Sequence, residues 1–324
     1  MLKGKRIAIT GLTGQIGGSV INLLAPHNEI IGLARYTRAG SREEVERLGV
    51  QAVCCDYTRG NFDGVPDDVD YVVHIAAEVF PPSFESGVHQ NAVGTGLLFN
   101  HFRKARAWIY VSTTGVYWDH PDPWYRYKET DRLGGSTRIT SRFAYGPTKF
   151  AGEAVAQALS EIHRVPVSIP RMNWSYGDHP YGHGGMPGNL VASVYEGRPV
   201  NVNPDWENVG SPIHEDDFTN QIEGFLDHAR IGGNIVNWAG DEPISVERLV
   251  PWIAQVMGRG YAFNETREAT SYPRATDNSR RIAQVGRCTV SWQEGIRRMI
   301  HHRYPGLPLH DAADPERGPP GAGD

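Results

Sequence analysis

A glycine-rich turn near the N-terminus constrains this chain more than any other feature. An apolar run at 6–10 leads into Gly11, Gly14 and Gly17, which stand three residues apart before an apolar helical pattern. Glycine at such positions lets the backbone turn sharply, approach a pyrophosphate and pack a helix closely against a strand. The free N–H groups at the helix N-terminus can then bind the phosphates. The predicted dinucleotide-binding turn is completed by Thr13, Gln15 and Ile16.

Short apolar runs alternate with helical patterns through the first half of the chain. Strands that are apolar on both faces and alternate with helices indicate a parallel sheet covered by helices on each side. We therefore expect an α/β fold built on a doubly wound parallel sheet. The predicted strands are 6–10, 29–34, 51–55, 71–76, 108–112 and 165–169, and the predicted helices are 15–24, 41–48 and 85–105.

The character of the sequence changes after Arg171. The segment 173–209 is dense in Gly, Pro, Asn and aromatic residues, with one helix predicted at 189–196. A strand at 234–237 and a helix at 246–257, with Ser245 as its N-cap, are predicted further on. We divide the chain into a dinucleotide-binding domain at 1–170, a partly interleaved substrate-binding lobe at 171–304, and a disordered tail at 305–324.

Composition limits the partners of the protein. The chain has 324 residues with 32 Lys and Arg against 37 Asp and Glu, so its net charge is −5. Without a basic block, we expect neither nucleic acid nor an anionic membrane as a partner. No apolar run approaches the roughly 18 residues of a membrane-spanning helix. The three cysteines, Cys54, Cys55 and Cys288, indicate reduced thiols in a cytoplasmic protein and no metal site.

The end of the second predicted strand bears on the cofactor. An acidic residue there would bind the free ribose 2′-hydroxyl of NAD, but this chain has Arg35 and, nearby, Arg38. A guanidinium can instead pair bidentately with a 2′-phosphate. We therefore expect NADP as the cofactor, with NAD as the alternative.

Two further strand ends are assigned to the cofactor. Asp56 and Tyr57 follow the third strand, where a carboxylate could accept a hydrogen bond from the adenine amino group. Ala76 and Ala77 follow the fourth strand and are small enough to let the cofactor pass.

Tyr145 and Lys149 stand four residues apart, so on a helix they share a face. A phenol with a pKa of about 10 is a poor acid–base group at neutral pH. A nearby ammonium favours the phenolate and makes proton transfer possible. A lysine at this spacing can also reach the ribose of a nicotinamide. Behind a glycine turn, this pair predicts proton transfer beside a nicotinamide cofactor.

Hydroxyl groups gather at the end of the fifth predicted strand. Ser112, Thr113 and Thr114 follow Val111, at the edge of the sheet where open α/β folds bind ligands. One of these hydroxyls can hold a substrate oxygen beside Tyr145. Val111 is assigned to the cofactor, and Thr113 and Thr114 to the substrate.

Five segments together resemble the extended short-chain dehydrogenase/reductase family, the NAD(P)-dependent epimerase/dehydratase group: 10–17, 91–95, 112–117, 145–149 and 171–177. The resemblance covers about residues 5–300. It implies a Rossmann-type sheet with a smaller C-terminal lobe, a catalytic set of Thr113, Tyr145 and Lys149, and a homodimer. Asn91 matches a family asparagine on the helix before the fifth strand, a structural or proton-relay position by this resemblance, and we also place it with the cofactor-binding residues.

Departures from the family pattern narrow the expected activity. Dehydratases carry an Asp-Glu pair directly after the catalytic Thr, where this chain has Thr114-Gly115. Nucleotide-sugar epimerases usually have an Asn three residues after the equivalent of Arg171, where this chain has Trp174. Arg267 could still fill the late diphosphate-binding arginine place of the family. Substrate contacts are therefore assigned to Thr113, Thr114, Trp174, Asn189 and Arg267.

These observations predict an NADP-dependent oxidoreductase that interconverts a carbonyl and an alcohol on a small, partly apolar metabolite. A nucleotide-sugar epimerase with tightly bound cofactor is the first alternative. A non-catalytic protein that senses the cofactor is the second.

Overall fold

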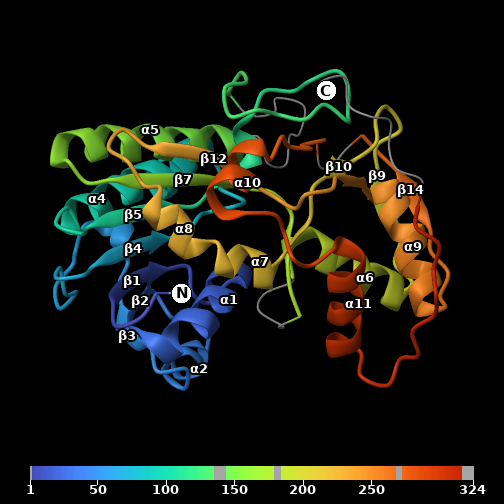
Figure 1. Ribbon diagram of the computed structural model, residues 1–324, viewed down its shortest axis with the longest axis horizontal. Helices are drawn as coiled ribbons and strands as arrows, with labels where there is room; N and C mark the ends of the chain where they lie inside the picture. The colour runs from blue at the N-terminus through green and yellow to red at the C-terminus, as the bar shows by residue number, and fades with distance from the viewer. Residues whose placement is uncertain (1, 135–143, 179–183, 268–271, 316–324) are drawn as a thin grey trace.

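The computed structural model describes residues 2–134, 144–178, 184–267 and 272–315 (Figure 1). At its centre lies a parallel sheet formed by β1 (Arg6–Thr10), β2 (Glu29–Ala34), β3 (Gln51–Cys54), β4 (Tyr71–His74), β5 (Ala107–Tyr110), β7 (Val167–Met172) and β12 (Asn234–Trp238). In the described residues the strand order is β12-β7-β5-β4-β1-β2-β3, and a short β6 (Ser112–Thr113) pairs with β7. The chain starts at β1, builds outward to β3, and crosses back to β4 on the other side of β1. This confirms the predicted doubly wound Rossmann-type sheet, with its switch point between β1 and β4.

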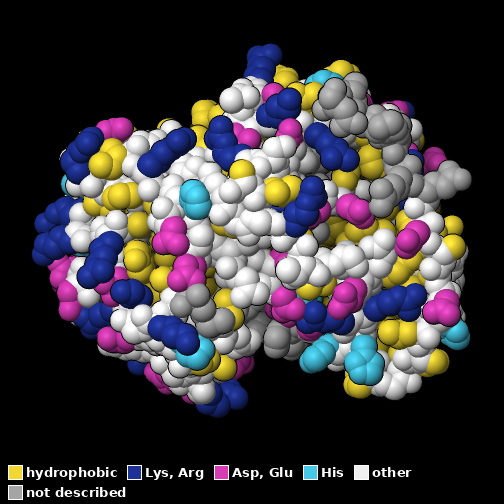
Figure 2. Space-filling model, in the orientation of Figure 1, with side chains coloured by type: hydrophobic (Ala, Val, Ile, Leu, Met, Phe, Trp, Pro, Cys, Tyr) yellow, Lys and Arg dark blue, Asp and Glu magenta, His cyan; other side chains and the backbone are white. Residues whose placement is uncertain are grey.

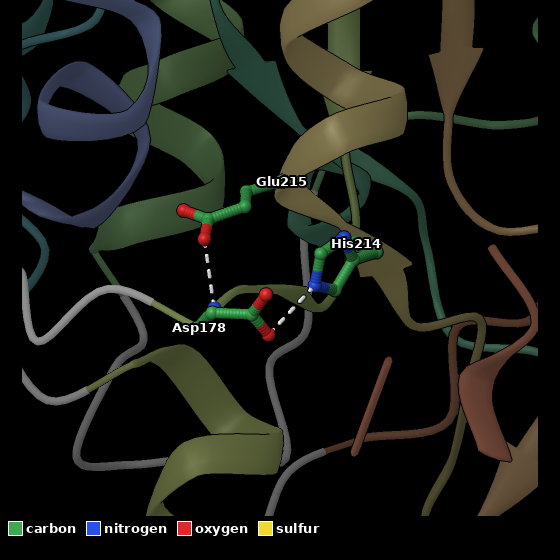
Figure 3. Close-up of side chains that lie close together, drawn as sticks. All are labelled: Asp178, His214 and Glu215. Atoms are coloured by element: carbon green, nitrogen blue, oxygen red, sulfur yellow. Dashed lines mark hydrogen bonds and ion pairs between the residues drawn. The ribbon is translucent and has the colours of Figure 1, made fainter. Parts of the chain in front are cut away.

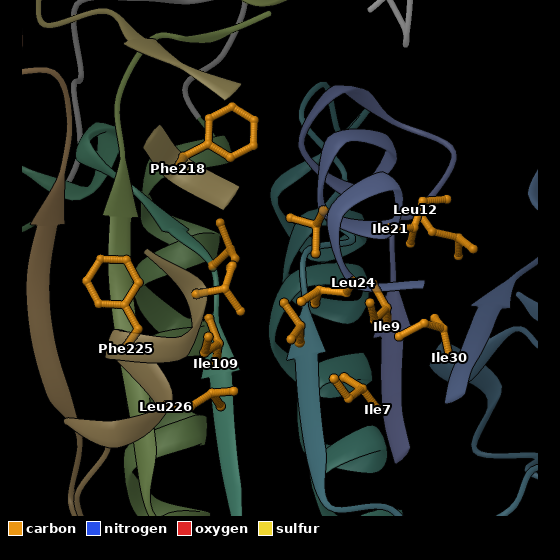
Figure 4. Packing of buried hydrophobic residues seen from close by; sticks show 14 of the residues in the cluster. Ile7, Ile9, Leu12, Ile21, Leu24, Ile30, Ile109, Phe218, Phe225 and Leu226 are labelled. Atoms are coloured by element: carbon orange, nitrogen blue, oxygen red, sulfur yellow. The ribbon is translucent and has the colours of Figure 1, made fainter. Parts of the chain in front are cut away.

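Helices cover both faces of this sheet. α1 (Gln15–Leu24), α2 (Ser41–Glu46), α7 (Glu215–Asn220) and α8 (Ile222–Asp227) lie on one face, and α4 (Gly94–His101) and α5 (Tyr145–His163) lie on the other. Successive side chains of a strand point to opposite faces. In β1, Ile7 and Ile9 pack against α1, whereas Ala8 belongs to the core under α4 and α5. Figure 4 shows the first of these cores, in which Ile7 and Ile9 meet the helical side chains Ile21 and Leu24.

The second half of the chain adds a lobe with its own apolar core (Figure 1, right). Three helices carry most of this core: α6 (Gly185–Glu196), α9 (Val246–Met257) and α11 (Trp292–Arg303). Short strands pair around them: β8 (Ser175–Tyr176) with β11 (Ile213–His214), β9 (Val200–Val202) with β14 (Phe263–Glu265), and β10 (Val209–Gly210) with β13 (Ile244–Ser245). α10 (Ser279–Val285) returns to pack beside β12 in the sheet.

The structure agrees with the predicted bounds of β1, β2, α1 and α9, and the ends of the other predicted strands and of α2 lie within three residues of the predicted bounds. Three further predictions differ more. The helix predicted at 85–105 is divided into α3 (Phe84–Val88), a π-helical turn η3 (His89–Val93) and α4. The helix predicted at 189–196 begins four residues earlier, as α6. The predicted disorder of 305–324 is wrong for 305–315, because Leu307, Leu309 and Ala312 pack against the lobe core and the His310 amide bonds to the Val256 carbonyl. Residues 316–324 lie outside the described part.

Candidate active site

The glycine turn follows β1 and passes very close to the backbone that follows β4. Gly11 has a φ of 72°, in the left-handed region, and a Cβ added there would lie 2.7 Å from the backbone N of Ala76. A Cβ on Gly17 would lie 2.2 Å from the carbonyl oxygen of Gly11. Gly14 has more room, since the nearest atom to an added Cβ is 3.4 Å away. Close backbone approach therefore requires glycine at positions 11 and 17, whereas at position 14, where the sequence led us to expect the same, the space would admit a Cβ in ordinary contact.

A cavity of about 430 Å³ opens over this turn. Its wall contains eleven of the residues predicted to bind the cofactor: Gly11, Thr13, Gly14, Gln15, Ile16, Arg35, Arg38, Asp56, Tyr57, Ala76 and Ala77. Gly17 is buried beneath the turn and does not line the cavity. Glu78 and Gln90 also line it and were not predicted.

The chemistry of this cavity fits a dinucleotide. Both amide atoms of the Gln15 side chain are buried and have no hydrogen-bond partner among the described residues. Such orphaned polar groups are uncommon unless a ligand or water satisfies them. Gln15 begins α1, whose free N–H groups face the turn. A pyrophosphate on this turn would meet both sets of groups.

The far end of the cavity, beyond β2, is basic. Arg35 is exposed and lines the cavity without an ion pair in the described structure, whereas Arg38 is bonded to the carboxylate of Glu44. Asp56 accepts hydrogen bonds from the amide and hydroxyl of Thr58, which hold the pKa of its carboxyl below the ordinary value. Arg35 is thus the more available cation of the two predicted arginines.

A second cavity, of about 410 Å³, adjoins the first. The two share Ile16, Ile75, Ala77 and Ser175 in their walls. The second cavity is further lined by Val79, Val111, Ser112, Thr113, Thr114, Gly115, Tyr145, Gly146, Met172, Asn173, Trp174, Gly185, Met186, Tyr272 and Arg274. The predicted acid–base tyrosine and the predicted threonine therefore face one space, which continues into the cofactor cavity.

The two threonines of this wall are held differently. Thr113 Oγ1 accepts a hydrogen bond from the backbone N of Gly115, at 3.1 Å, and the side chain remains partly exposed to the cavity. Thr114 is buried, and its hydroxyl accepts a hydrogen bond from the Asn173 amide. Thr113 is therefore better placed than Thr114 to meet a substrate oxygen.

Lys149 lies behind Tyr145 on α5 and is 1% exposed. Its ammonium nitrogen lies 4.0 Å from the centre of the Tyr110 ring, a cation–π contact. Burial lowers the pKa of Lys149 to about 7, because a charged ammonium loses its hydration there. Glu153 acts in the opposite direction. Lys149 does not line either cavity, so any effect of its charge on Tyr145 comes from a position inside the core, behind the cavity wall.

A buried ion pair holds the end of β7 against α5. Arg171 and Glu153 are both fully buried and bonded through two contacts, of 2.9 and 2.8 Å. The hydroxyl of Ser112 donates to the same carboxylate. Breaking such a pair leaves an uncompensated buried charge. The ion pair therefore joins β7 to the helix that carries Tyr145, and the bond from Ser112 joins β6, the strand that carries Thr113, to the same carboxylate.

Asn91 lies in the π-helical turn and does not touch either cavity. Its side chain exchanges two hydrogen bonds with the backbone of Glu78 and donates a third to the hydroxyl of Thr148. The predicted cofactor residue Asn91 is thus placed to hold the cavity wall and α5, not to contact a ligand.

The predicted substrate residues separate into two groups. Trp174 lines the second cavity and its indole packs over Gly210, where an added Cβ would lie 2.2 Å from the ring. Asn189 is exposed on α6 and lines neither cavity. Arg267 is bonded to Asp205 at the surface, outside both cavities. The structure therefore brings Trp174 to the site and leaves Asn189 and Arg267 away from it.

Arg274 is a site residue that the sequence analysis missed. It lines the second cavity, donates to the Asp119 carboxylate at 2.8 Å, and lies over the rings of Tyr127 and Tyr272. Arg267 was instead assigned to the late arginine position of the family, and it lies outside the cavity. Arg274 lies closer to Asp277 and is the one that the fold turns inward.

Asp178, His214 and Glu215 form a buried group, and the side-chain atoms that could bind a metal ion lie within 4.8 Å of one another (Figure 3). Hydrogen bonds to other protein groups already engage these residues. His214 Nε2 lies 3.2 Å from an Asp178 oxygen, Arg298 donates to the other oxygen, and the Asp178 amide donates to Glu215. This group joins the lobe to the sheet domain, since Glu215 also accepts from Ser19 on α1.

The distribution of surface charge and the character of the helices concern possible nucleic-acid and membrane partners. Figure 2 shows basic and acidic side chains interspersed over this face of the molecule. In the described part of the chain, no helix combines the length and apolar character needed to cross a membrane.

The parallel sheet, the glycine turn and the paired cavities are typical of α/β proteins that bind a dinucleotide. The chain belongs to the NAD dependent epimerase/dehydratase family, whose model matches residues 7–238. The resemblance to the extended short-chain dehydrogenase/reductases is thereby confirmed. A comparison with curated proteins found no match.

Solved structures share the fold over nearly the whole chain. UDP-glucuronic acid 4-epimerase from Bacillus cereus, in complex with UDP-glucuronic acid and NAD, aligns with a TM-score of 0.79 at 20% identity, covering 92% of this chain and 98% of that one. UDP-glucose 4-epimerase from Thermus thermophilus, with NAD, gives 0.77 at 22% identity, covering 93% and 99%. dTDP-glucose 4,6-dehydratase from Bacillus anthracis, also with NAD, gives 0.75 at 20% identity, covering 93% and 96%. At these identities the likeness concerns the fold.

Proposed function

We propose that the protein is an NADP(H)-dependent oxidoreductase that interconverts a carbonyl and an alcohol on a small, partly apolar substrate. The observation that carries the proposal is the continuous space from the glycine turn to Thr113 and Tyr145. A dinucleotide on the turn would reach the shared wall at Ile75 and Ala77, beside the proposed acid–base group.

Three residues at or behind the second cavity would have separate roles in the reaction: Thr113, Tyr145 and Lys149. A bound nicotinamide supplies or accepts the hydride at the substrate carbon. In the reducing direction the Tyr145 phenol gives its proton to the carbonyl oxygen, and solvent restores that proton later. Thr113 donates a hydrogen bond to the same oxygen and orients it. The positive charge of Lys149, one helical turn away, favours the phenolate and so lowers the cost of the proton transfer.

The walls of the second cavity support a partly apolar substrate. Trp174, Met172 and Met186 contribute apolar surface, and Trp174 stands where nucleotide-sugar epimerases usually have an asparagine. Thr114-Gly115 replace the acidic pair of the dehydratases. The alternative of an epimerase keeps one favourable observation, because Arg274 lines the cavity with a guanidinium.

The experiment that tests the proposal measures NADPH consumption by the purified protein with a panel of ketones and aldehydes. Net consumption with at least one carbonyl, abolished in Tyr145→Phe, is the expected result. Interconversion of a UDP-sugar without net NADPH consumption would replace the proposal with the epimerase. Cofactor binding with neither activity, across both panels, would favour a sensing role.

Replacement of Arg35 by Ala is expected to change the cofactor preference. A charge-assisted hydrogen bond to a 2′-phosphate contributes about 1.5–3 kcal/mol. The Kd of NADPH, measured by fluorescence titration, should therefore rise about 10- to 100-fold, with the Kd of NADH changed by less than about threefold. Arg42→Ala is the matched control, since Arg42 pairs with Glu46 and does not line the cavity. An equal loss for both cofactors in Arg35→Ala would remove the argument for NADP.

We also propose a homodimer. Val93 in η3 and Ile162 in α5 are large apolar side chains with 44% and 70% exposure, on two segments that pack against each other. Light scattering should give twice the mass of one chain, and the mass of a single chain would contradict the dimer.

We propose further that the protein works in a reducing compartment such as the cytoplasm, because Cys54, Cys55 and Cys288 are free thiols.

A further inference from the structure

A line of buried polar side chains connects the end of β1 to the catalytic helix α5. Thr10, His74, Thr95 and Asn91 are each at most 2% exposed. Thr10 Oγ1 lies 2.7 Å from His74 Nδ1, and His74 Nε2 lies 3.0 Å from Thr95 Oγ1. Thr95 then donates to the carbonyl oxygen of Asn91 at 2.8 Å. None of these four side chains lines either cavity.

The hydrogen bonds of Thr10 determine the protonation of His74. A hydroxyl has one donor and two lone pairs. Thr10 Oγ1 accepts from the backbone N–H groups of Ile75 and Ala76, each at 3.1 Å, which uses both lone pairs. Its own proton must therefore go to His74 Nδ1. His74 Nε2 then carries the ring proton and donates it to Thr95, whose proton goes to Asn91.

His74 is consequently a neutral imidazole with its proton on Nε2. Burial, with Lys149 second, lowers the pKa of His74 to about 3. The aromatic neighbours of the ring are Tyr57 and Tyr110, with centroids 5.3 and 5.7 Å away. If Nδ1 of His74 carried a proton, it would be a third donor directed at Thr10 Oγ1, which has no lone pair left to accept it. The protons along the line from Thr10 to Asn91 therefore have a single consistent arrangement.

Both ends of this line meet the active site. At one end, Thr10 holds the backbone of Ile75 and Ala76, and Ile75 lines both cavities. At the other end, Asn91 bonds to the hydroxyl of Thr148, which lies between Tyr145 and Lys149 and donates to the Tyr145 carbonyl. Asn91 also holds the backbone of Glu78.

We propose that His74 is a positioning residue of the active site, which with Thr10 and Thr95 holds the shared cavity wall at 75–78 at a fixed distance from the catalytic helix α5. This inference deepens the proposed function and rests on it for its kinetic consequence. The structural consequence, that 75–78 and 145–152 are coupled through Thr95, can be measured whatever the reaction is.

The test compares Thr95→Val with Thr95→Ser in the full chain. Valine keeps the shape of threonine but removes the hydroxyl, which leaves the His74 Nε2–H and the Asn91 carbonyl without this partner. Serine keeps the hydroxyl. Hydrogen exchange followed by mass spectrometry should show about tenfold faster exchange at both 75–78 and 145–152 in Thr95→Val, and rates within about twofold of wild type in Thr95→Ser. Faster exchange confined to 89–101, or equally fast exchange throughout α9, would overturn the coupling.

Two further measurements bear on the same inference. With ¹⁵N-labelled histidine at pH 7, the signals lost in His74→Phe should be those of an unprotonated Nδ1 and a protonated Nε2, and any other tautomer would overturn the assignment. With a carbonyl substrate, Thr95→Val should lower kcat about tenfold, since small misplacements of reacting groups are costly, while KM changes little and Thr95→Ser restores kcat. A lower Tm with unchanged kcat would show a structural role alone. If the wild-type protein reduces no carbonyl, the proposed function fails, and the exchange and tautomer measurements still decide the coupling.

Discussion

Tyr145→Phe is expected to lower kcat for carbonyl reduction about a thousandfold, within the range that general acid–base groups contribute. Tyr145 begins α5 and faces the second cavity together with Thr113. Phenylalanine keeps the ring and its packing but has no proton to give to the substrate oxygen. The Kd of NADPH should stay within about twofold of wild type, because the dinucleotide binds mainly at the glycine turn.

The control for this substitution is Tyr195→Phe. Tyr195 stacks on Tyr304 in the lobe, with ring centroids 3.7 Å apart, and lies outside both cavities. Its kcat should match that of the wild type. A Tyr145→Phe enzyme that keeps more than a tenth of the wild-type kcat would exclude Tyr145 as the proton donor.

Lys149→Met is expected to have two opposite effects: a loss of activity and a gain in stability. The activity falls about 100-fold or more, because the phenol of Tyr145 loses the charge that favours its ionised form. The stability rises because the wild-type protein must bury Lys149, whose pKa falls from 10.5 to about 7 on folding. Methionine fills the same space without a charge. A gain of a few kcal/mol corresponds to a Tm increase of roughly 5 °C at pH 7.

The pH dependence of this gain follows from the sign of the pKa shift. Between pH 7 and 10.5 the unfolded chain binds more protons at Lys149 than the folded protein does, so wild-type stability rises with pH across that window. The Tm difference between Lys149→Met and wild type should therefore be largest below about pH 7 and shrink toward pH 10.5. Scanning calorimetry of the cofactor-free proteins measures it.

Lys104→Met is the matched control for this prediction. Lys104 is a surface residue, 67% exposed in its side chain, and pairs with Asp67 at 3.0 Å. An exposed pair contributes about 0–1 kcal/mol, so this variant should show a small Tm change and little trend between pH 7 and 10.5. A Tm of Lys149→Met below that of wild type at pH 7 would contradict the burial argument.

Local patterns in the sequence predicted the parts of the fold that local patterns determine. The bounds of β1, β2 and α1 agree because an apolar run, a glycine turn and an amphipathic helix follow each other directly. The sequence predicts one continuous helix at 85–105, which the structure divides into α3, η3 and α4. Asn91, in the π-helical turn, bonds to Glu78 and Thr148, which lie outside the predicted helix, and such bonds cannot be read from the local pattern.

The same distinction applies to the site. The turn glycines and the Tyr145–Lys149 spacing are local, and the structure places Gly11, Gly14 and Tyr145 in the walls of two adjoining cavities, with Lys149 buried behind them. Which arginine enters the second cavity depends on how 272–278 packs beside Asp119 and Tyr127, and no spacing rule carries that information. The burial of Lys149 and the line from Thr10 to Asn91 are likewise products of tertiary packing.

The separate cores of the sheet domain and the lobe bear on how such a protein can diversify. Thr113, Tyr145 and Lys149 stand on elements of the sheet domain, and Met186 belongs to a helix of the lobe, against whose core Trp174 also packs. Substitutions in the lobe can therefore change the lobe side of the second cavity while Thr113, Tyr145 and Lys149 keep their positions. In evolution, the lobe of such a protein can therefore vary toward new substrates while the sheet domain keeps the proposed catalytic residues unchanged.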